Sequence, residues 1–331
     1  MELVCPAGSL PAFEQAVNHG ADAVYIGFRD STNARAFAGL NFDDERAAKA
    51  LALARARGVK LFVALNTYAE SGNTARWYDA VDRVAALGAD ALIAADLGVL
   101  DYASRHYPDL ALHLSVQGSA TNYEALDFYV RRFGIRRAVL PRVLSLKQVR
   151  QVAASGRVDV EVFGFGSLCI MAEGRCYLSS YMTGESPNQQ GVCSPARFVE
   201  WRQSGAQMES RLNGVVIDRF GPDEKAGYPT LCKGRFECQG QTSHVLEEPT
   251  SLNTMAILPD LLAAGVKAIK LEGRQRSPAY VGQVVSVWRQ AIDRLKKDPA
   301  GFRPDPHWMA VLQGFSEGSQ TTLGPYDRPW Q

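Results

Sequence analysis

Long apolar runs are missing from this sequence. The chain has 331 residues, of which 46% are apolar and 21% charged, the composition of an ordinary globular protein. No segment approaches the roughly 18 consecutive apolar residues that a membrane-spanning helix needs. The first residues, Met1–Val4, enter a strand-like pattern directly instead of a targeting segment. We therefore expect a cytoplasmic protein with no transmembrane segment.

A strong net charge is missing too. Lysine and arginine total 36 against 35 aspartates and glutamates, which leaves a formal net charge of +1. Such a chain has no overall field that attracts a polyanion, so we expect no nucleic-acid partner. We interpret the one local basic cluster as a solvated helix end, with a phosphate-binding patch as the alternative; its members are Arg131, Arg132, Arg136, Arg137 and Arg142.

Familiar hydrolase motifs are absent as well. The five histidines form no H-E-x-x-H motif for zinc, and no G-x-S-x-G nucleophile turn occurs. A cysteine nucleophile would need a histidine beside it, and the sequence does not place one. The residues therefore give a peptidase little support.

What the sequence does contain is a regular alternation of strand-like and helix-like segments. Eight short runs are rich in the β-branched and aromatic residues typical of strands: Glu2–Cys5, Ala23–Gly27, Lys60–Asn66, Ala91–Asp96, Leu112–Val116, Ala138–Pro141, Val160–Phe165 and Ala268–Glu272. Helical periodicity lies at about 10–17, 43–57, 74–87, 97–106, 122–133, 145–155 and 251–264, and in a last helix that Ser277 and Pro278 begin. Eight such units favour an α/β fold, a TIM-like (β/α)8 barrel with regular or imperfect closure, over an open sheet.

Chain length supports a barrel with one insertion. Removing residues 170–248 leaves 252 residues, close to the roughly 250 of a typical barrel. We therefore predict four parts: 1–169 with the first seven strands, 170–248 as a cysteine-rich insertion after the seventh, 249–300 with the last helix–strand–helix, and 301–331 as a C-terminal tail. Within the insertion, 212–218 and 233–245 are expected to form short antiparallel strands.

Four of the six cysteines are grouped by their local setting. Cys169 follows the seventh strand beside the turn-forming Gly164 and Gly166, and the next three are Cys176, Cys193 and Cys232, at gaps of 7, 17 and 39 residues. Zinc usually takes short C-x-x-C knuckles, which are lacking here. Irregular gaps suit an iron–sulfur cluster better, because each iron takes one cysteine from a different loop. Zinc and a site without metal stay open as alternatives.

The two remaining cysteines have simpler interpretations. Cys5 lies in an apolar first strand, so we predict that it packs in the core. Cys238 lies in a polar, hairpin-like stretch, where we predict an incidental thiol.

In such a barrel, reactive residues lie where strands end on the C-terminal side. Arg142 and Arg274 follow the sixth and eighth strands, so they flank the seventh, which delivers Cys169. Adjacent strands are about 4.8 Å apart, and guanidinium groups bind carboxylates in a bidentate manner. We therefore predict a carboxylate-binding mouth beside the cysteines. Glu272 is expected to orient one arginine, or alternatively to form a structural ion pair with Arg274.

Neutral hydrogen-bonding residues also end strands. Asn66 and Gln117 are candidate site residues at the ends of the third and fifth strands. The alternative for Asn66, as for Asp96 and Asn122, is that the side chain only ties down a loop or caps a helix.

At this point a family resemblance enters, carried by a specific motif around the cysteines. The motif is Glu161-x-Phe163-x-x-Gly166-Ser167-Leu168-Cys169-x-x-x-x-Gly174-x-Cys176-x-Leu178-Ser179. Three shorter pieces agree with it: Cys5-Pro6-Ala7-Gly8, residues 20–27 and Lys270-Leu271-Glu272-Gly273-Arg274. Together they cover nearly the whole chain, which resembles the peptidase U32, or collagenase-like peptidase, family. Segments 166–188 and 320–324 most resemble its ubiquinone-biosynthesis branch.

The resemblance implies a cofactor, a reaction and a partner. The cofactor is a 4Fe–4S cluster on Cys169, Cys176, Cys193 and Cys232. The reaction is hydroxylation of the aromatic ring of a ubiquinone precursor without dioxygen, with prephenate as a candidate oxygen donor. The partner is a related protein of the same branch, in a heterodimer, and a lipid-carrier protein is expected to shield the isoprenoid tail.

Two further functions are compatible with the same resemblance. Other relatives hydroxylate RNA bases, although the near-zero net charge weighs against RNA here. The other is a non-catalytic scaffold, in which the cluster only stabilises the complex with the partner.

Overall fold

The computed structural model describes residues 1–169, 176–187 and 193–328. Eight parallel strands follow each other in chain order around a barrel, which closes because the eighth strand pairs with both the first and the seventh. The strands are β1 (Glu2–Pro6), β2 (Ala23–Ile26), β3 (Lys60–Leu65), β4 (Ala91–Ala94), β5 (Ala111–Leu114), β6 (Arg137–Val139), β7 (Asp159–Ser167) and β14 (Ala268–Leu271). The predicted TIM-like (β/α)8 barrel is confirmed.

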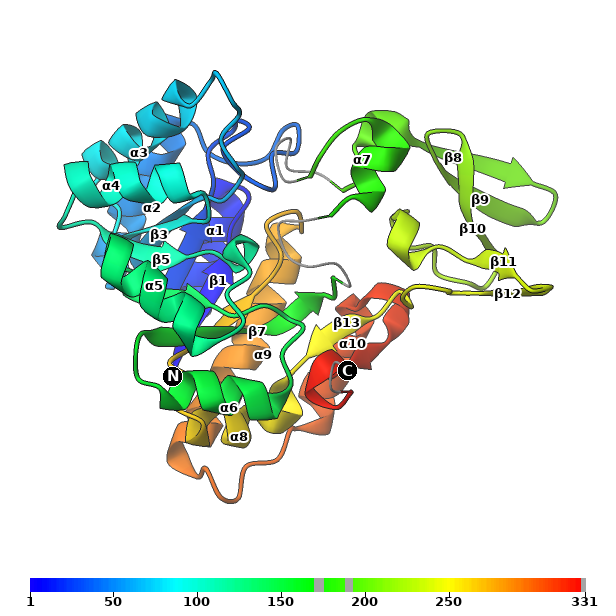
Figure 1. Cartoon of the computed structure of the whole chain (residues 1–331). Coiled ribbons are helices and arrows are strands. Elements are labelled where there is room, and N and C mark those ends of the chain that lie inside the picture. Colours follow the sequence, from blue (N-terminus) through cyan, green and yellow to red (C-terminus); the bar gives the residue numbers. More distant parts are fainter. Residues whose placement is uncertain (170–175, 188–192, 329–331) are drawn as a thin grey trace.

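Helices alternate with these strands and cover the outside of the barrel (Figure 1). They are α1 (Leu10–Asn18), α2 (Asp44–Arg57), α3 (Ala75–Leu87), α4 (Leu97–His106), α5 (Tyr123–Phe133), α6 (Leu146–Ala154), α8 (Leu258–Ala263) and α9 (Pro278–Lys297). The predicted start of the last helix is confirmed, since the amide of Tyr280 donates to the Ser277 hydroxyl at 3.2 Å. In the part of the chain that the structure describes, no helix combines the length and the apolarity needed to cross a bilayer.

Successive residues of each strand point alternately outward to the helices and inward to the barrel interior. Leu3 and Cys5 of β1 point outward and are fully buried against the helices, whereas Val4 points into the barrel. Cys5 is thus a core residue, as predicted, and burial raises the pKa of its thiol. Cys238 is exposed, in agreement with its interpretation as an incidental thiol.

The barrel interior contains a buried ionic network as well as apolar side chains. Glu161 of β7 lies 2.8 Å from Lys270 Nζ and 3.3 Å from Arg137 Nη1, and Arg137 also contacts Glu2 at 2.7 Å. Burial opposes ionisation of Glu161, but Lys270 and Arg137 outweigh it and lower the pKa of the carboxyl. Because each charge has a partner, the network closes the N-terminal part of the barrel without an isolated buried ion.

A bulge in β7 sets the path of the chain toward the cysteines. The register against β14 shifts between Phe163 and Phe165, so Gly164 is the extra residue. A Cβ on Gly164 would lie 2.4 Å from Ile269 Cγ2, and only glycine fits there. The sharp turn expected at Gly164 and Gly166 is wrong, because the strand continues through both glycines to Ser167.

Beyond the bulge, β7 extends past the barrel wall and pairs with a strand outside the barrel. β13 (Ser251–Asn253) pairs with its last residues in antiparallel fashion, and β15 (Thr321–Thr322) pairs with β13. The helix predicted over 251–264 is therefore wrong at its start, where β13 and a 3₁₀ turn (Met255–Ile257) precede α8. Helix α10 (Pro306–Phe315) leads the chain to β15.

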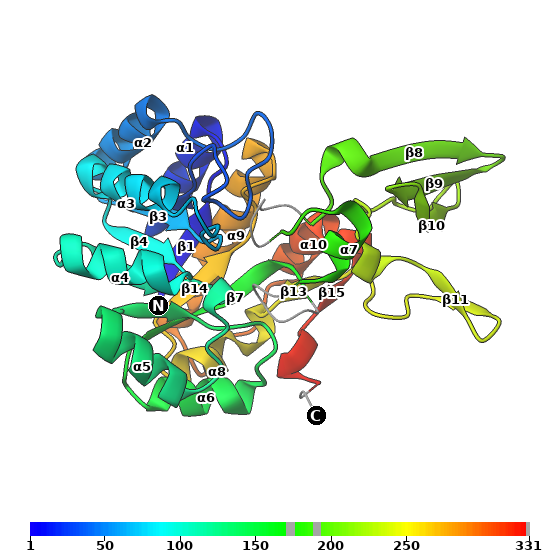
Figure 2. The same cartoon turned by 45° about the horizontal axis from the view of Figure 1, so that its top comes forward.

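The cysteine-rich insertion lies to one side of the barrel in both views (Figures 1 and 2). Its elements are α7 (Leu178–Thr183), β8 (Val199–Ser204), β9 (Gln207–Leu212), β10 (Val215–Phe220), β11 (Phe236–Cys238) and β12 (Gln241–Ser243). The antiparallel strand expected over 212–218 is confirmed for 215–218, which lie in β10, but its start is wrong because residues 213 and 214 form the turn between β9 and β10. The antiparallel strands expected over 233–245 are β11 and β12. Residues 170–175 and 188–192 of the predicted insertion, and 329–331 of the predicted tail, lie outside the described residues.

The buried histidine of the barrel interior makes stability depend on pH. His113 packs edge-on against Phe62, and burial lowers its pKa to about 3. In the unfolded chain the pKa of a histidine is about 6.5. Between these values only the unfolded chain binds the proton, so stability is lost as the pH falls. From pH 7 to pH 5 we expect the free energy of unfolding to fall by about 2 kcal/mol more in the wild type than in His113→Gln. Urea unfolding at both pH values checks this, and parallel losses in the two proteins would contradict it.

Candidate functional site

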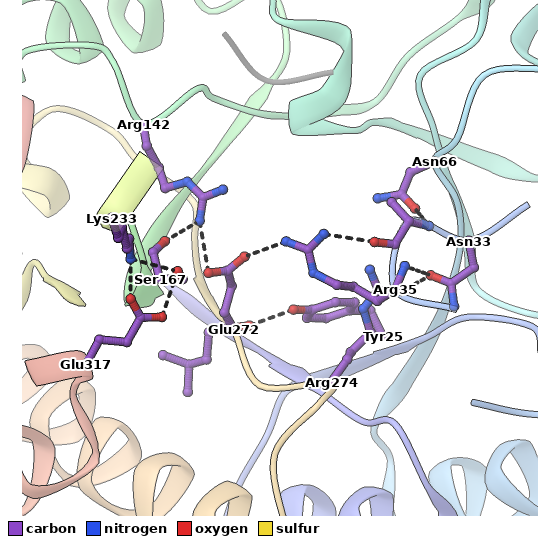
Figure 3. Close-up of polar contacts among 12 residues, drawn as sticks. Tyr25, Asn33, Arg35, Asn66, Arg142, Ser167, Lys233, Glu272, Arg274 and Glu317 are labelled. Atoms are coloured by element: carbon purple, nitrogen blue, oxygen red, sulfur yellow. Dashed lines mark hydrogen bonds and ion pairs between the residues drawn. The ribbon is translucent and has the colours of Figure 1, made fainter. Parts of the chain in front are cut away.

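An ion pair at the C-terminal end of the barrel joins the strands on either side of β7. Arg142 follows β6 and Glu272 follows β14, and Arg142 Nη1 lies 2.9 Å from Glu272 Oε2 (Figure 3). The same guanidinium donates to the carbonyl oxygen of Ser167 at 2.6 Å and lies over the ring of Phe163 at 4.4 Å. Arg142 is only 6% exposed. The expectation that Glu272 orients an arginine is met by Arg142.

Two more arginines reach this mouth. Arg35, from the loop after β2, places Nη2 at 3.8 Å from Glu272 Oε1. Arg274 Nη1 donates to Asn33 Oδ1 at 2.5 Å, and its guanidinium lies 5.4 Å from the centre of the Tyr25 ring. The predicted alternative of an Arg274–Glu272 ion pair is wrong, because Arg274 bonds to an amide oxygen and Glu272 pairs with the other two arginines.

The mouth therefore carries an excess of positive charge. The guanidinium groups of Arg35 and Arg142 flank the carboxylate of Glu272, and that of Arg274 lies beside Tyr25 and Asn33 at the same end of the barrel (Figure 3). Burial lowers the pKa of Arg274 to about 10, which still leaves it cationic at neutral pH. Planar, partly dehydrated guanidinium groups bind carboxylates strongly. The geometry suits an anionic ligand with carboxylate groups.

The neutral hydrogen-bonding residues that were predicted at the strand ends have different roles in the structure. Asn66 Oδ1 accepts from the amide of Ala34 at 3.1 Å, so it ties down the loop that carries Arg35. Asp96 caps α4 and Asn122 caps α5, as the alternative interpretation expected. Gln117 lies after β5, where its side-chain oxygen is buried and accepts no hydrogen bond from the described residues.

The basic cluster of the sequence does not form a single patch. Arg131 and Arg132 pair with Asp127 and Asp101 on the outer helices. Arg137 points into the barrel and Arg142 into the mouth, as described above. The phosphate-patch alternative therefore loses its basis.

Contacts bring together the segments that carry three of the cysteines. Ser179, in the first turn of α7 after Cys176, donates its hydroxyl to the carbonyl oxygen of Cys193. Helix α7 also packs against the 3₁₀ turn Leu231–Lys233, which contains Cys232. Burial raises the pKa of the Cys232 thiol, and the neighbouring Cys176 acts in the same direction.

The fourth cysteine is connected through β7. Cys169 comes two residues after Ser167, at the C-terminal end of the barrel. Lys233, the residue after Cys232, places Nζ at 3.3 Å from Ser167 Oγ. These contacts bring all four cysteine-bearing segments to one corner, and Ser167 of this corner accepts a hydrogen bond from Arg142 of the Arg142–Glu272 pair.

The four cysteines of these segments are thiols, the kind of donor that a cluster takes. None of the six cysteines forms a disulfide. Among the described residues, no three His, Cys, Asp or Glu side chains converge as they would around a single ion. Thiolates are ligands for iron–sulfur clusters, and a four-iron cluster takes four of them, one on each iron.

Three residues of the site have no local signal in the sequence. Arg35 lies in an irregular loop, and Glu317 lies in the segment predicted to be a tail. Lys233 is adjacent to Cys232, and this position is the only hint of its role. Glu317 pairs with Lys233 and accepts a hydrogen bond from Ser167 at 2.9 Å.

Comparisons with known proteins agree on one family. The family model described as peptidase family U32 matches residues 8–324. tRNA hydroxylation protein P1 of Bacillus subtilis is 30% identical over 314 residues, which cover 94% of this chain and 67% of that protein. tRNA hydroxylation protein P of Escherichia coli is 30% identical over 342 residues, with 97% and 73% covered. A 23S rRNA 5-hydroxycytidine synthase of Escherichia coli is 30% identical over 295 residues, with 89% and 40% covered.

The mouth depends on a glycine that leaves room for Glu272. Gly166 has a φ of +147°, and a Cβ there would lie 2.5 Å from Glu272 Cβ. We expect Gly166→Ala to lower the free energy of unfolding by about 2–4 kcal/mol, from overpacking and backbone strain together. Gly205→Ala is the matched control, because Gly205 has a φ of +61° with open space around it; it should cost only about 1 kcal/mol. Equal losses in denaturant unfolding would contradict the steric argument.

Proposed function

The chain belongs to the peptidase U32 family, and on that premise we propose that it is the iron–sulfur subunit of an oxygen-independent hydroxylase. One observation carries this proposal: the four cysteine-bearing segments meet beside a barrel mouth with three arginines and one carboxylate. A cysteine site holds a redox cofactor, and a cationic mouth holds an anionic reactant next to it. Relatives at 30% identity are named for hydroxylation of tRNA and rRNA, which supports the reaction class.

The cofactor in this proposal is a 4Fe–4S cluster held by Cys169, Cys176, Cys193 and Cys232. When bound, it supplies one-electron transfer. The chain itself supplies a half-buried corner in which burial raises the pKa of Cys232, so this thiol has to lose its proton on ligation.

The proposed substrate is the aromatic ring of a ubiquinone precursor. Residues 166–188 and 320–324 resemble UbiU, of the oxygen-independent route of ubiquinone biosynthesis. The insertion supports an uncharged or lipid-tailed substrate more than a polyanion, because residues 170–248 contain eight lysines and arginines but ten aspartates and glutamates. Tyr177 and Tyr181 of this part are 71% and 76% exposed and offer an aromatic surface.

Hydroxylation without dioxygen needs another source of the oxygen atom. In the balanced reaction, a ring C–H and a donor C–OH exchange to give a ring C–OH and a donor C–H, so the ring is oxidised by two electrons and the donor is reduced. Prephenate is the donor we propose, because its carboxylates suit the guanidinium groups of Arg142 and Arg274. Glu272 would orient Arg142, and the side-chain oxygen of Gln117, which accepts no hydrogen bond from the described residues, would accept one from a hydroxyl group.

Partners complete the proposed enzyme. We propose a heterodimer with a UbiV-like paralogue, together with a lipid-carrier protein that shields the isoprenoid tail of the precursor. Tyr177 and Tyr181 of the insertion, both largely exposed, are residues that this partner would cover.

Hydroxylation of an RNA base is the second candidate function. Names of relatives at 30% identity, one acting on tRNA and one on 23S rRNA, favour it. The net charge of +1 and the acidic balance of the insertion oppose it. The third possibility is a scaffold. It is distinguished by removing the cluster while the complex is retained and then measuring hydroxylation, because the activity is lost if the cluster is catalytic and is kept if the cluster only stabilises the complex.

Replacing the proposed cluster ligands tests the cofactor. Protein purified without oxygen should be brown, with about four irons and four sulfides per chain. Cys169→Ala, Cys176→Ala, Cys193→Ala and Cys232→Ala should each lose the colour, whereas the control variants Cys5→Ala and Cys238→Ala should keep it. Iron and sulfide analysis with visible absorption measures the outcome. Stoichiometric zinc without iron in the anaerobic wild type would refute the cluster.

Replacing the mouth arginines tests the donor site. Arg142→Ala removes a charge, and Arg274→Lys keeps the charge but loses the planar fork. Each should leave the iron content unchanged and reduce hydroxylation per cluster by roughly 10- to 100-fold, as expected for the loss of a hydrogen bond to a charged group. Arg276→Ala is the matched control, because Arg276 lies on the same turn but is exposed. If Arg142→Ala and Arg274→Lys both retain the cluster and the normal rate, the donor does not bind at this mouth.

A further inference from the structure

The C-terminal segment carries a glutamate that the backbone fixes next to β7. The amide of Glu317 donates to the hydroxyl of Ser251 at 3.0 Å, and Ser251 of β13 pairs with Ser167 of β7. A few residues later, β15 pairs with β13 in parallel. Glu317 is therefore held in place by the sheet and not by its side-chain contacts alone.

The Glu317 side chain contacts two residues that are close in sequence to proposed cluster ligands. Its Oε1 accepts from Ser167 Oγ at 2.9 Å, and its Oε2 pairs with Lys233 Nζ (Figure 3). Lys233 directly follows Cys232, and Ser167 precedes Cys169 by two residues. The three side chains thus join the two cysteine segments that are 63 residues apart in the sequence.

Burial makes the Lys233–Glu317 pair strong enough to matter. The side chains are 9% and 23% exposed, so both charges are mostly removed from water. Removal of one partner from a buried pair leaves an uncompensated charge and is far more disruptive than the loss of an exposed pair. The pair therefore fixes the turn that contains Cys232 against the end of β7.

The same corner is connected to the barrel mouth. The carbonyl oxygen of Ser167 accepts from Arg142, which pairs with Glu272. A displacement of Ser167 would therefore move a cysteine segment and a mouth arginine together.

We propose that Glu317 and Lys233 are positioning residues that hold Cys232 against Cys169, so that the four cysteines close on one cluster beside the mouth. This inference rests on the proposed cluster. It gives the C-terminal segment a function in the site, although that segment contributes no cysteine.

Four variants test the inference: Glu317→Gln, Lys233→Met, the double variant of both, and Lys233→Arg, all prepared without oxygen. The first two should still bind iron but lose it to a chelator about 10- to 100-fold faster than the wild type, as found for groups that orient metal ligands. The double variant should be no faster than the worse single one, because the pair acts as a unit. Lys233→Arg, which keeps the charge, should restore most of the wild-type rate.

A second measurement does not need the cluster. In apo protein, hydrogen exchange of the amides over 231–238 should become faster in Glu317→Gln and Lys233→Met. The controls are Glu237→Gln and Lys225→Met, because both side chains are exposed on the same insertion; neither rate should change. A wild type that contains iron but variants with unchanged rates would overturn this inference alone. A wild type without iron would overturn the proposed function as well.

Discussion

The end of strand β7 at Ser167 is the point at which the two halves of the site meet, and Arg142 donates a hydrogen bond to its carbonyl oxygen. Ser167 is the last residue of β7, a strand that continues beyond the barrel wall because Gly164 allows a bulge. On one side its carbonyl holds the arginine that pairs with Glu272. On the other side its hydroxyl meets Glu317. The cysteine corner and the cationic mouth therefore share one strand end.

This arrangement explains how the barrel and the insertion both contribute residues to one site. The barrel gives rigid strand ends, and a parallel barrel gathers its functional side chains on the C-terminal side. The insertion alone has few buried residues and many exposed ones. Its turn with Cys232 contacts both β7 and the C-terminal segment through Lys233, so the site draws on all three parts of the chain.

Much of the fold could be predicted from the sequence, because buried parallel strands are short apolar runs at regular spacing. All eight barrel strands were predicted in this way. The insertion was predicted less well, since its strands are polar and half exposed, and the turn at Asn213 and Gly214 fell inside a predicted strand. β13 was missed because its three residues continue directly into a helical pattern.

The site could also be predicted only in part from the sequence. Arg142 and Glu272 could be placed near each other from strand order alone, because the strands before them flank β7. The sequence could not show which arginine Glu272 binds, since side-chain lengths and loop paths decide that. Arg35 and Glu317 could not be found at all, because each reaches the site from a segment with no periodic pattern.

The central claim is that the mouth and the cluster serve one ligand. The most direct measurement is the EPR spectrum of the reduced, anaerobically prepared protein with and without prephenate that carries ¹³C in its carboxylates. We predict that the ligand changes the cluster signal and adds a hyperfine coupling from ¹³C, and that Arg142→Ala abolishes both effects while the cluster remains. A cluster signal that is the same with and without the ligand, or a coupling that persists in Arg142→Ala, would contradict the account.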